Sequence, residues 1–156
     1  MKRILFVCTG NTCRSSMAEA LFRHSLLEAG LAGEYHASSA GTSAFPGMPA
    51  SHNAIQALEA LGIDLSRHSS STIDNDIVDK ADLILTMTAS HKKSLLRFRP
   101  DIAGKTYTLA EYIGAEDSGD IEDPFGGDLE IYMNCRDKIN RYIEALINKL
   151  KEKGEC

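Results

Sequence analysis

The chain has no long hydrophobic run, and it holds few cysteines. None of its apolar stretches approaches the ~18 residues that a membrane span needs, so we expect no membrane partner. The first stretch, Ile4 to Val7, is too short for the core of a secretory signal peptide.

Without such a signal, a structural disulfide framework is not expected. Cys8 and Cys13 lack a second close Cys/His pair, so we expect no closed zinc site. We also expect no other metal and no cofactor, because a thiolate, Arg14 and backbone amides can handle the charge of a phosphate. The cysteines are Cys8, Cys13, Cys135 and Cys156.

Basic residues are outnumbered, with 17 Lys and Arg against 22 Asp and Glu and a net charge of −5. Such a chain has no general attraction for nucleic acid, and any phosphate must be captured by a local site. Lys and Arg are absent between Ala110 and Glu130, a segment that is either a solvated loop or a neighbourhood suited to cationic substrates. Its acidic residues are Glu111, Glu116, Asp117, Asp120, Glu122, Asp123, Asp128 and Glu130.

What is present fits one globular domain over residues 1–156, because 43% apolar and 25% charged residues are close to the average. The patterns predict strands over 4–7, 35–38, 83–85 and 106–109. They predict helices that begin at Ser15 or Ser16 and end at Gly30, that cover 50–61 and 90–97, and that follow an N-cap at Asp128. A loop is expected over 39–49.

Strands that alternate with helices predict an α/β fold, a parallel sheet with helices on both faces. Ligands of such sheets bind at the carboxyl ends of the strands. The loop after the first strand is therefore the expected position of an active site. It reads Cys8-Thr9-Gly10-Asn11-Thr12-Cys13-Arg14-Ser15.

This loop has the composition of a phosphate-binding loop. It lies between a buried strand and a helix start, where backbone amides converge and the helix dipole favours anions. Gly10 allows a positive φ and Asn11 tolerates one, so the amides can turn inward, and we expect Asn11 to hold the shape of the loop through the backbone. Cys8 would be a nucleophilic thiolate, Arg14 a fork for phosphoryl oxygens, and Ser15 a hydrogen-bond donor to the Cys8 sulfur.

A cysteine that attacks phosphorus also needs an acid for the leaving group and a base for water. One carboxyl on a loop can do both, and Asp123, followed by Pro124, is the candidate. The alternative is structural, because Asp-Pro before Phe-Gly-Gly is also good turn chemistry.

These residues together resemble the low-molecular-weight protein tyrosine phosphatase family over nearly the whole chain. The resemblance rests on the segment from Val7 to Ser15 and on Asp123-Pro124 near the carboxyl end. It implies a flavodoxin-like fold with Cys8 as nucleophile, Arg14 as phosphate clamp and Asp123 as general acid and base. It also implies supporting roles for Asn11, Ser15, Ser39 and His68. The other histidines, namely His24, His36, His52 and His91, are expected to be surface or packing residues.

Two departures from the family pattern resemble its protein arginine phosphatase branch. Thr12 stands where tyrosine phosphatases usually have an aliphatic residue, and Gly126 follows Phe125 where a second aromatic is usual. A phosphotyrosine ring is stabilised by stacking between two aromatic side chains, so the loss of one of them disfavours phosphotyrosine. The Thr12 hydroxyl adds hydrogen-bonding capacity. Neutral drift at Thr12 is the alternative. The resemblance further implies a bacterial, cytoplasmic, monomeric enzyme that acts on arginine-phosphorylated proteins.

Three other functions compete with this hypothesis. A tyrosine phosphatase would use the same catalytic residues. An arsenate reductase needs further cysteines after residue 80, and none stands between Cys13 and Cys135. A phospho-binding module has no use for both a nucleophile and an acid.

The resemblance also favours a protective, reversible disulfide between Cys8 and Cys13, although Cys13 could simply pack behind the loop. Cys135 is expected in the core.

Overall fold

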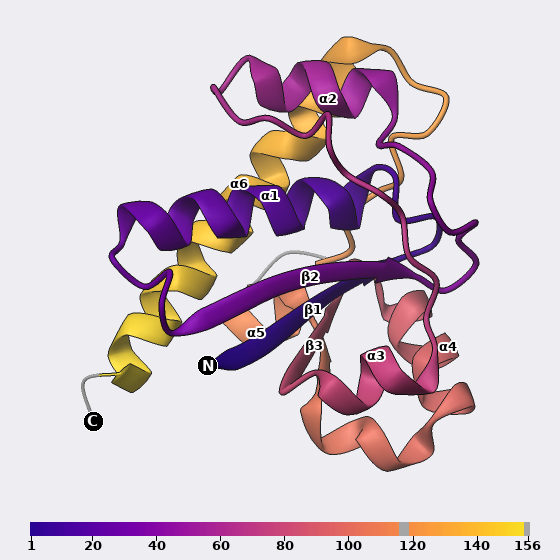
Figure 1. Cartoon of the computed structure of the whole chain (residues 1–156), viewed down its shortest axis with the longest axis vertical. Helices are drawn as coiled ribbons and strands as arrows, with labels where there is room; N and C mark the ends of the chain where they lie inside the picture. Colours follow the sequence, from indigo (N-terminus) through magenta and orange to yellow (C-terminus); the bar gives the residue numbers. More distant parts are fainter. Residues whose placement is uncertain (116–118, 155–156) are drawn as a thin grey trace.

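Four parallel strands form the centre of the protein, and helices cover both faces of the sheet (Figure 1). The computed structural model describes residues 1–115 and 119–154, so Glu116, Asp117 and Cys156 lie outside the described residues. The strands are β1 (Lys2–Cys8), β2 (Tyr35–Gly41), β3 (Leu83–Thr86) and β4 (Thr106–Thr108), in the order β2-β1-β3-β4. Every paired strand runs parallel to its neighbour, which confirms the expected fold class.

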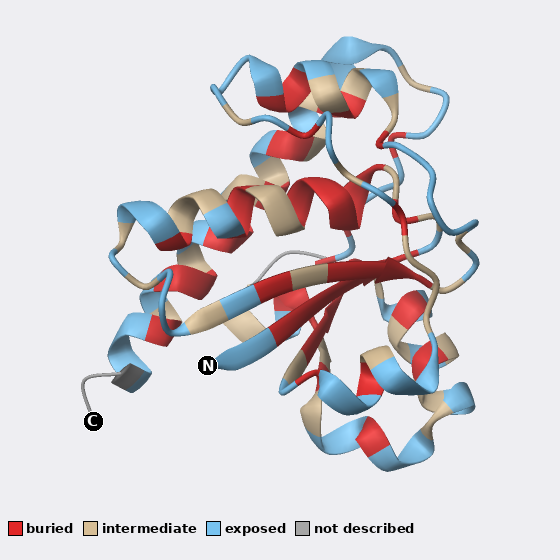
Figure 2. Cartoon of the chain, in the orientation of Figure 1, coloured by how far each residue is buried: buried red, intermediate tan, exposed pale blue. Residues whose placement is uncertain are grey.

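The helices divide into two layers. They are α1 (Arg14–Glu28), α2 (His52–Glu59), α3 (Asn75–Lys80), α4 (Ala89–Phe98), the 3-10 helix η1 (Pro100–Lys105), α5 (Leu109–Ile113) and α6 (Leu129–Gly154). Side chains of β1 alternate between the layers: Ile4 and Phe6 join the core under α1, α2, α5 and α6, whereas Leu5 and Val7 join the core under α3, α4 and η1. Figure 2 shows the buried residues along the sheet and the exposed outer surfaces of the helices.

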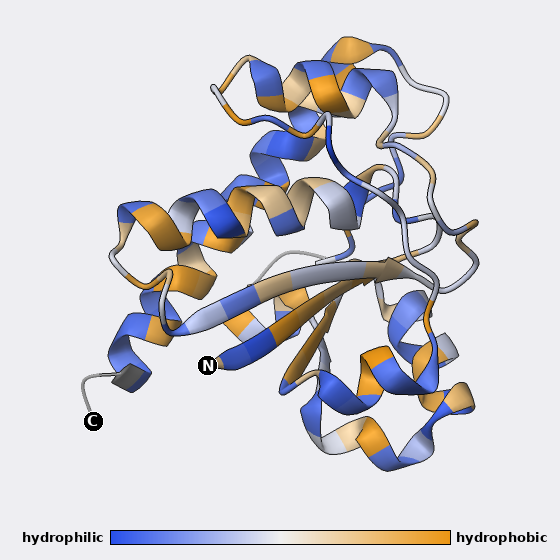
Figure 3. Ribbon diagram, in the orientation of Figure 1, coloured by the Kyte–Doolittle hydropathy of each residue, from blue (hydrophilic) through white to orange (hydrophobic). Residues whose placement is uncertain are grey.

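The predicted strands are present, and β2 is longer than expected. It continues to Gly41 through a segment predicted as loop, because Ser39 to Gly41 pair with Phe6 to Cys8 of β1. Figure 3 shows the reason for the error, since β2 is much paler in hydropathy than β1 and β3. A strand with few apolar residues is stabilised by its sheet neighbour rather than by its own pattern.

The helix starts are partly as predicted. Asp128 caps α6, since the amide of Ile131 donates to its Oδ1 atom at 3.0 Å. The cap of α1 is not Ser15 or Ser16, because both lie inside the helix, which begins at Arg14. The short helices α3, η1 and α5 were not predicted, since six, six and five residues are too few for a clear periodic signal. Among the described helices, none combines the length and hydropathy that crossing a bilayer requires.

Candidate active site

Cys8 is the last residue of β1, and the loop over 9–13 carries the chain from it into α1. Cys8 is buried, at 2% exposure, and its sulfur has two hydrogen-bond contacts among the described residues. Ser15 Oγ lies 2.8 Å away, the contact that the sequence predicted, and the Asn11 amide donates at 3.3 Å. The loop thus brings a backbone amide to the sulfur, and the first turn of α1 brings a hydroxyl and the positive end of the helix dipole.

Asn11 is the fully buried residue that holds the loop in shape. Its Nδ2 donates to Ser15 Oγ at 2.8 Å and to Ser39 Oγ at 2.9 Å, and its Oδ1 accepts from the Ser71 amide at 2.8 Å. Asn11 also carries the positive φ, at 59°, whereas Gly10 does not use the freedom expected of it. The Asn11 side chain therefore holds the loop through Ser15, Ser39 and the distant Ser71 amide, and not by bonding the backbone of the loop as expected.

The predicted supporting residues reach the loop from two other segments. Ser39 stands in β2, and its hydroxyl donates to Glu19 Oε1 at 2.6 Å while accepting from Asn11. His68 Nε2 lies 2.6 Å from the Asn11 carbonyl oxygen. Glu19, which no sequence signal singled out, completes the network from α1. These contacts fix the loop from outside.

Arg14 begins α1 and points across the site toward the acidic segment. Its guanidinium is nearly buried, with Nη1 donating to the Ile121 carbonyl at 3.0 Å and Nη2 lying 3.7 Å from Asp123 Oδ2. Its Nε is buried and has no hydrogen-bond partner within residues 1–115 and 119–154. A buried N–H donor without an acceptor is costly, and an oxyanion bound in the loop would satisfy it.

Asp123 lies on an exposed turn beside the loop, with a side chain that is 51% exposed. The turn interpretation of Asp123-Pro124 is confirmed, because the Phe125 amide donates to Asp123 Oδ1 at 3.1 Å and Gly126 has a φ of 82°. The same turn leaves Asp123 Oδ2 facing Arg14 and leaves Phe125 79% exposed. Turn and acid are therefore compatible roles for this residue.

Thr12 and Cys13 form the far side of the loop. The Thr12 carbonyl accepts from the Ser51 amide at 2.9 Å, and among the described residues the only hydrogen-bond partner of its hydroxyl is the Cys13 sulfur, at 3.8 Å. Cys13 is buried and its sulfur lies 3.3 Å from the Tyr132 hydroxyl. Burial, together with this contact, raises the pKa of Tyr132 to about 12, so the phenol is neutral. Cys8 and Cys13 are free thiols with different partners, and their disulfide stays a prediction.

His91, expected to be a surface or packing residue, is buried and hydrogen-bonds a residue of the loop. It lies on α4, where Nε2 is 2.9 Å from Thr9 Oγ1 and Nδ1 is 3.1 Å from Thr88 Oγ1. Burial, with the Arg14 guanidinium nearby, lowers the pKa of His91 to about 4, so the ring is neutral at pH 7. The signal was available in the topology: β3 runs parallel beside β1, so the residues after β3 come close to the loop after β1.

Comparisons with known proteins agree with this geometry. The family model of the low molecular weight phosphotyrosine protein phosphatase matches residues 3–156. This chain belongs to that family. A protein-arginine-phosphatase of Geobacillus stearothermophilus is 41% identical over 149 residues, which are 96% of each chain.

The similar solved structures include one named as an arginine phosphatase and one named as a tyrosine phosphatase. A YwlE arginine phosphatase mutant with a phosphorylated active-site serine matches with a TM-score of 0.91 and 40% identity, covering 96% of this chain and 95% of that one. A low molecular weight protein tyrosine phosphatase of T. tengcongensis matches with a TM-score of 0.89 and 42% identity, covering 96% and 99%. Membership in the family therefore establishes both the fold and a cysteine-dependent phosphatase. The substrate has to be inferred from the residues of the site.

In the acidic segment between Ala110 and Glu130, every described Asp and Glu residue is exposed. These are Glu111, Asp120, Glu122, Asp123, Asp128 and Glu130. Asp120 accepts from the Ala89 amide at 3.0 Å and Glu111 pairs with Lys92, so part of this charge serves local structure.

Cys135, expected in the core, is half-buried and packs against the core, and burial raises the pKa of its thiol to about 12. A thiol with that pKa is no second nucleophile at pH 7.

Proposed function

We propose that this chain is a protein arginine phosphatase that works as one domain, residues 1–156. The observation that carries the phosphatase part is the buried Arg14 Nε, which has no acceptor among the described residues, together with a Cys8 sulfur that contacts the Ser15 hydroxyl and accepts from the Asn11 amide. A phosphoryl group in the loop supplies the missing acceptor. Its oxygens would meet the loop amides over 9–15, while Cys8 stands in line to attack phosphorus.

The proposed first step transfers the phosphoryl group from arginine to Cys8. The Cys8 thiolate forms a bond to phosphorus, and the bond from phosphorus to the guanidino nitrogen breaks. The electron pair goes to that nitrogen, which takes a proton from the carboxylic acid of Asp123. Arg14 holds the equatorial oxygens, and the Ser15 hydroxyl stabilises the sulfur as attacking and leaving group.

The second step hydrolyses the cysteinyl phosphate. Water attacks phosphorus, its proton passes to the Asp123 carboxylate, and the sulfur leaves as thiolate. Asp123 lies within 3.7 Å of Arg14 and is half-exposed, so it is near the phosphoryl position and also open to water. One carboxyl on a turn can thus serve as acid in one step and base in the next.

The substrate side of the proposal rests on Thr12 and on the turn after Asp123. The Thr12 hydroxyl has only a distant sulfur contact within the described chain, so it can bond a polar substrate group. Phe125 is exposed and followed by Gly126, which leaves one aromatic wall instead of two. A guanidinium needs hydrogen bonds and a carboxylate more than it needs two aromatic walls. The proposed enzyme acts as a cytoplasmic monomer on phosphorylated proteins.

The test compares kcat/KM on phosphoarginine and phosphotyrosine versions of one peptide. We expect the phosphoarginine peptide to be the better substrate, and equal or faster tyrosine turnover would contradict the proposal. The variant Thr12→Ile should shift the ratio toward phosphotyrosine, because an aliphatic side chain replaces the hydroxyl. If both rates fall by the same factor, Thr12 does not select the substrate. Thr9→Val is the matched control, since it also removes a loop hydroxyl, and it should leave the ratio unchanged.

A further inference from the structure

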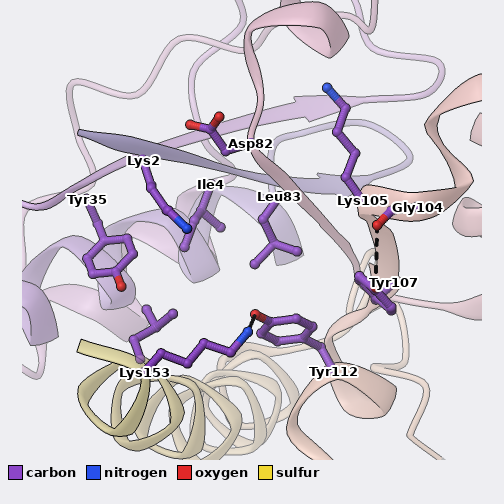
Figure 4. Close-up of a pocket in the computed structure, with 11 residues that line it drawn as sticks. Lys2, Ile4, Tyr35, Asp82, Leu83, Gly104, Lys105, Tyr107, Tyr112 and Lys153 are labelled. Atoms are coloured by element: carbon purple, nitrogen blue, oxygen red, sulfur yellow. Dashed lines mark hydrogen bonds between the residues drawn. The ribbon is translucent and has the colours of Figure 1, made fainter. Parts of the chain in front are cut away.

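A cavity of about 430 Å³ opens at the end of the sheet opposite to Cys8. It lies where β1, β2 and β3 begin, and it is closed by β4, by α5 and by the last turns of α6 (Figure 4). Its volume is within the range of small-molecule sites. Nothing in the phosphatase mechanism uses it, because the proposed catalytic residues stand at the carboxyl ends of the strands.

The lining of this cavity combines apolar and aromatic surface. Ile4 and Leu83 of the sheet form its back, and the rings of Tyr35 and Tyr112 stand on either side of the space. Tyr107 packs against Tyr112 with ring centroids 5.3 Å apart. Aromatic side chains around an apolar floor suit a flat ring, which can stack on them.

Two ammonium groups face the same space. In Figure 4, Lys2 and Lys153 extend into the cavity, whereas Lys105 and Asp82 point away from it. Lys153 Nζ donates to the Tyr112 hydroxyl at 2.8 Å. Within residues 1–115 and 119–154, no carboxylate lies within 4.0 Å of either ammonium group.

The positive charge at this cavity contrasts with the net charge of −5 of the chain. Lys149 lies on the other side of the lining, with Nζ 4.3 Å from the centroid of the Tyr112 ring and bonded to the Tyr112 carbonyl, and it does not line the cavity itself. The hydrogen bond to Tyr112 raises the pKa of Lys153, and burial raises the pKa of Tyr35. Lys153 therefore keeps its ammonium charge and Tyr35 keeps its phenolic proton at pH 7, and both can donate hydrogen bonds to an anion.

We propose that this lysine–tyrosine cavity binds a small aromatic anion of the size of a nucleoside monophosphate. The ring would lie between Tyr35 and Tyr112 over the apolar floor, and the phosphate would bridge Lys2 and Lys153. Both halves of the ligand are needed, because the floor offers no partner to a phosphate and the ammonium groups offer none to a neutral ring. This site is separate from the proposed catalytic site and does not depend on its substrate.

The experiment uses AMP as the probe with the full-length protein, followed by amide NMR shifts so that the two anion sites are distinguished. We expect shifts at the starts of β1, β2 and β3 and in α5, with weaker binding at higher salt. The double variant Lys2→Ala/Lys153→Ala should weaken AMP binding at least tenfold. Lys80→Ala, whose ammonium pairs with Asp76 at 3.0 Å, should leave it unchanged.

Two further probes separate the parts of the ligand. Adenosine and inorganic phosphate should each bind the cavity at least tenfold more weakly than AMP. Tyr112→Phe keeps the ring but removes the hydroxyl that holds Lys153, so it should weaken AMP binding several-fold with the fold intact. AMP shifts confined to the loop over 9–15 would overturn the proposal. So would an affinity that neither the double variant nor Tyr112→Phe changes.

Discussion

Replacing Asn11 should lower the stability of the protein far more than its single side chain suggests. The side chain makes three hydrogen bonds, two of them buried, to Ser15 and Ser39, and one part-buried, to the Ser71 amide. At about 1 kcal/mol each, their loss costs about 3 kcal/mol. The φ of 59° adds about 1 kcal/mol for Ala, which tolerates the left-handed region poorly, and nothing for Gly.

The expected free energies of unfolding therefore fall by about 4 kcal/mol in Asn11→Ala and about 3 kcal/mol in Asn11→Gly. For a chain of this size, these losses correspond to Tm decreases of about 8–16 °C and about 6–12 °C. Thermal and urea unfolding, followed by circular dichroism, measure both. Asn148→Ala on the exposed side of α6 is the control and should change stability by less than about 0.5 kcal/mol.

Two results would refute this reasoning. If Asn11→Gly unfolds at the wild-type temperature, the buried hydrogen bonds contribute nothing to stability. If Asn11→Ala and Asn11→Gly are equally stable, the left-handed backbone of the loop carries no cost. In both variants kcat/KM should also fall, because Ser15 loses the partner that orients its hydroxyl toward Cys8.

Three more predictions concern residues around the loop. The depressed pKa of His91, about 4 against 6.5 unfolded, means that the unfolded state binds its proton first, so stability should fall as the pH drops from about 6.5 to 4. His91→Gln should show a flatter Tm profile over that range, and an unchanged profile would contradict the assignment. Gly41→Ala should lower kcat/KM and Tm, because its Cβ would meet the Thr9 carbonyl and come within 2.9 Å of Ala44 Cβ; wild-type kinetics would show that the loop yields. Asp123→Asn should lower kcat by about 10²–10⁴ with the Tm unchanged, and wild-type turnover would remove Asp123 from the mechanism.

The sequence predicted best what local pattern and chain order determine. The apolar runs of β1 and β3 and the periodic face of α6 needed no tertiary information. The loop after β1 was found because strand, turn and helix start follow one another directly. By contrast, Ser39 to Gly41 look like loop residues, and only their pairing with β1 makes them strand.

The sequence signals the candidate site where its residues follow one another in the loop after β1. It gives no signal for contacts between residues that are far apart in the chain. His91 stands 82 positions from its partner Thr9, and a lone histidine on a short helix gives no local signal. The serines at the start of α1 were misassigned because their hydroxyls bond elsewhere, Ser15 to Cys8 and Ser16 to the Cys13 carbonyl. Both cases concern side chains whose partners the chain brings together only on folding.

The central claim is that Cys8 takes the phosphoryl group from phosphoarginine, and the variant Cys8→Ser tests it most directly. An alkoxide leaves phosphorus less readily than a thiolate, so a group transferred to the new hydroxyl should remain there. After incubation with an arginine-phosphorylated protein, peptide mass spectrometry should find phosphate at position 8, and the additional variant Arg14→Ala should abolish it. Phosphate at another residue, or transfer from phosphotyrosine but not from phosphoarginine, would contradict the account.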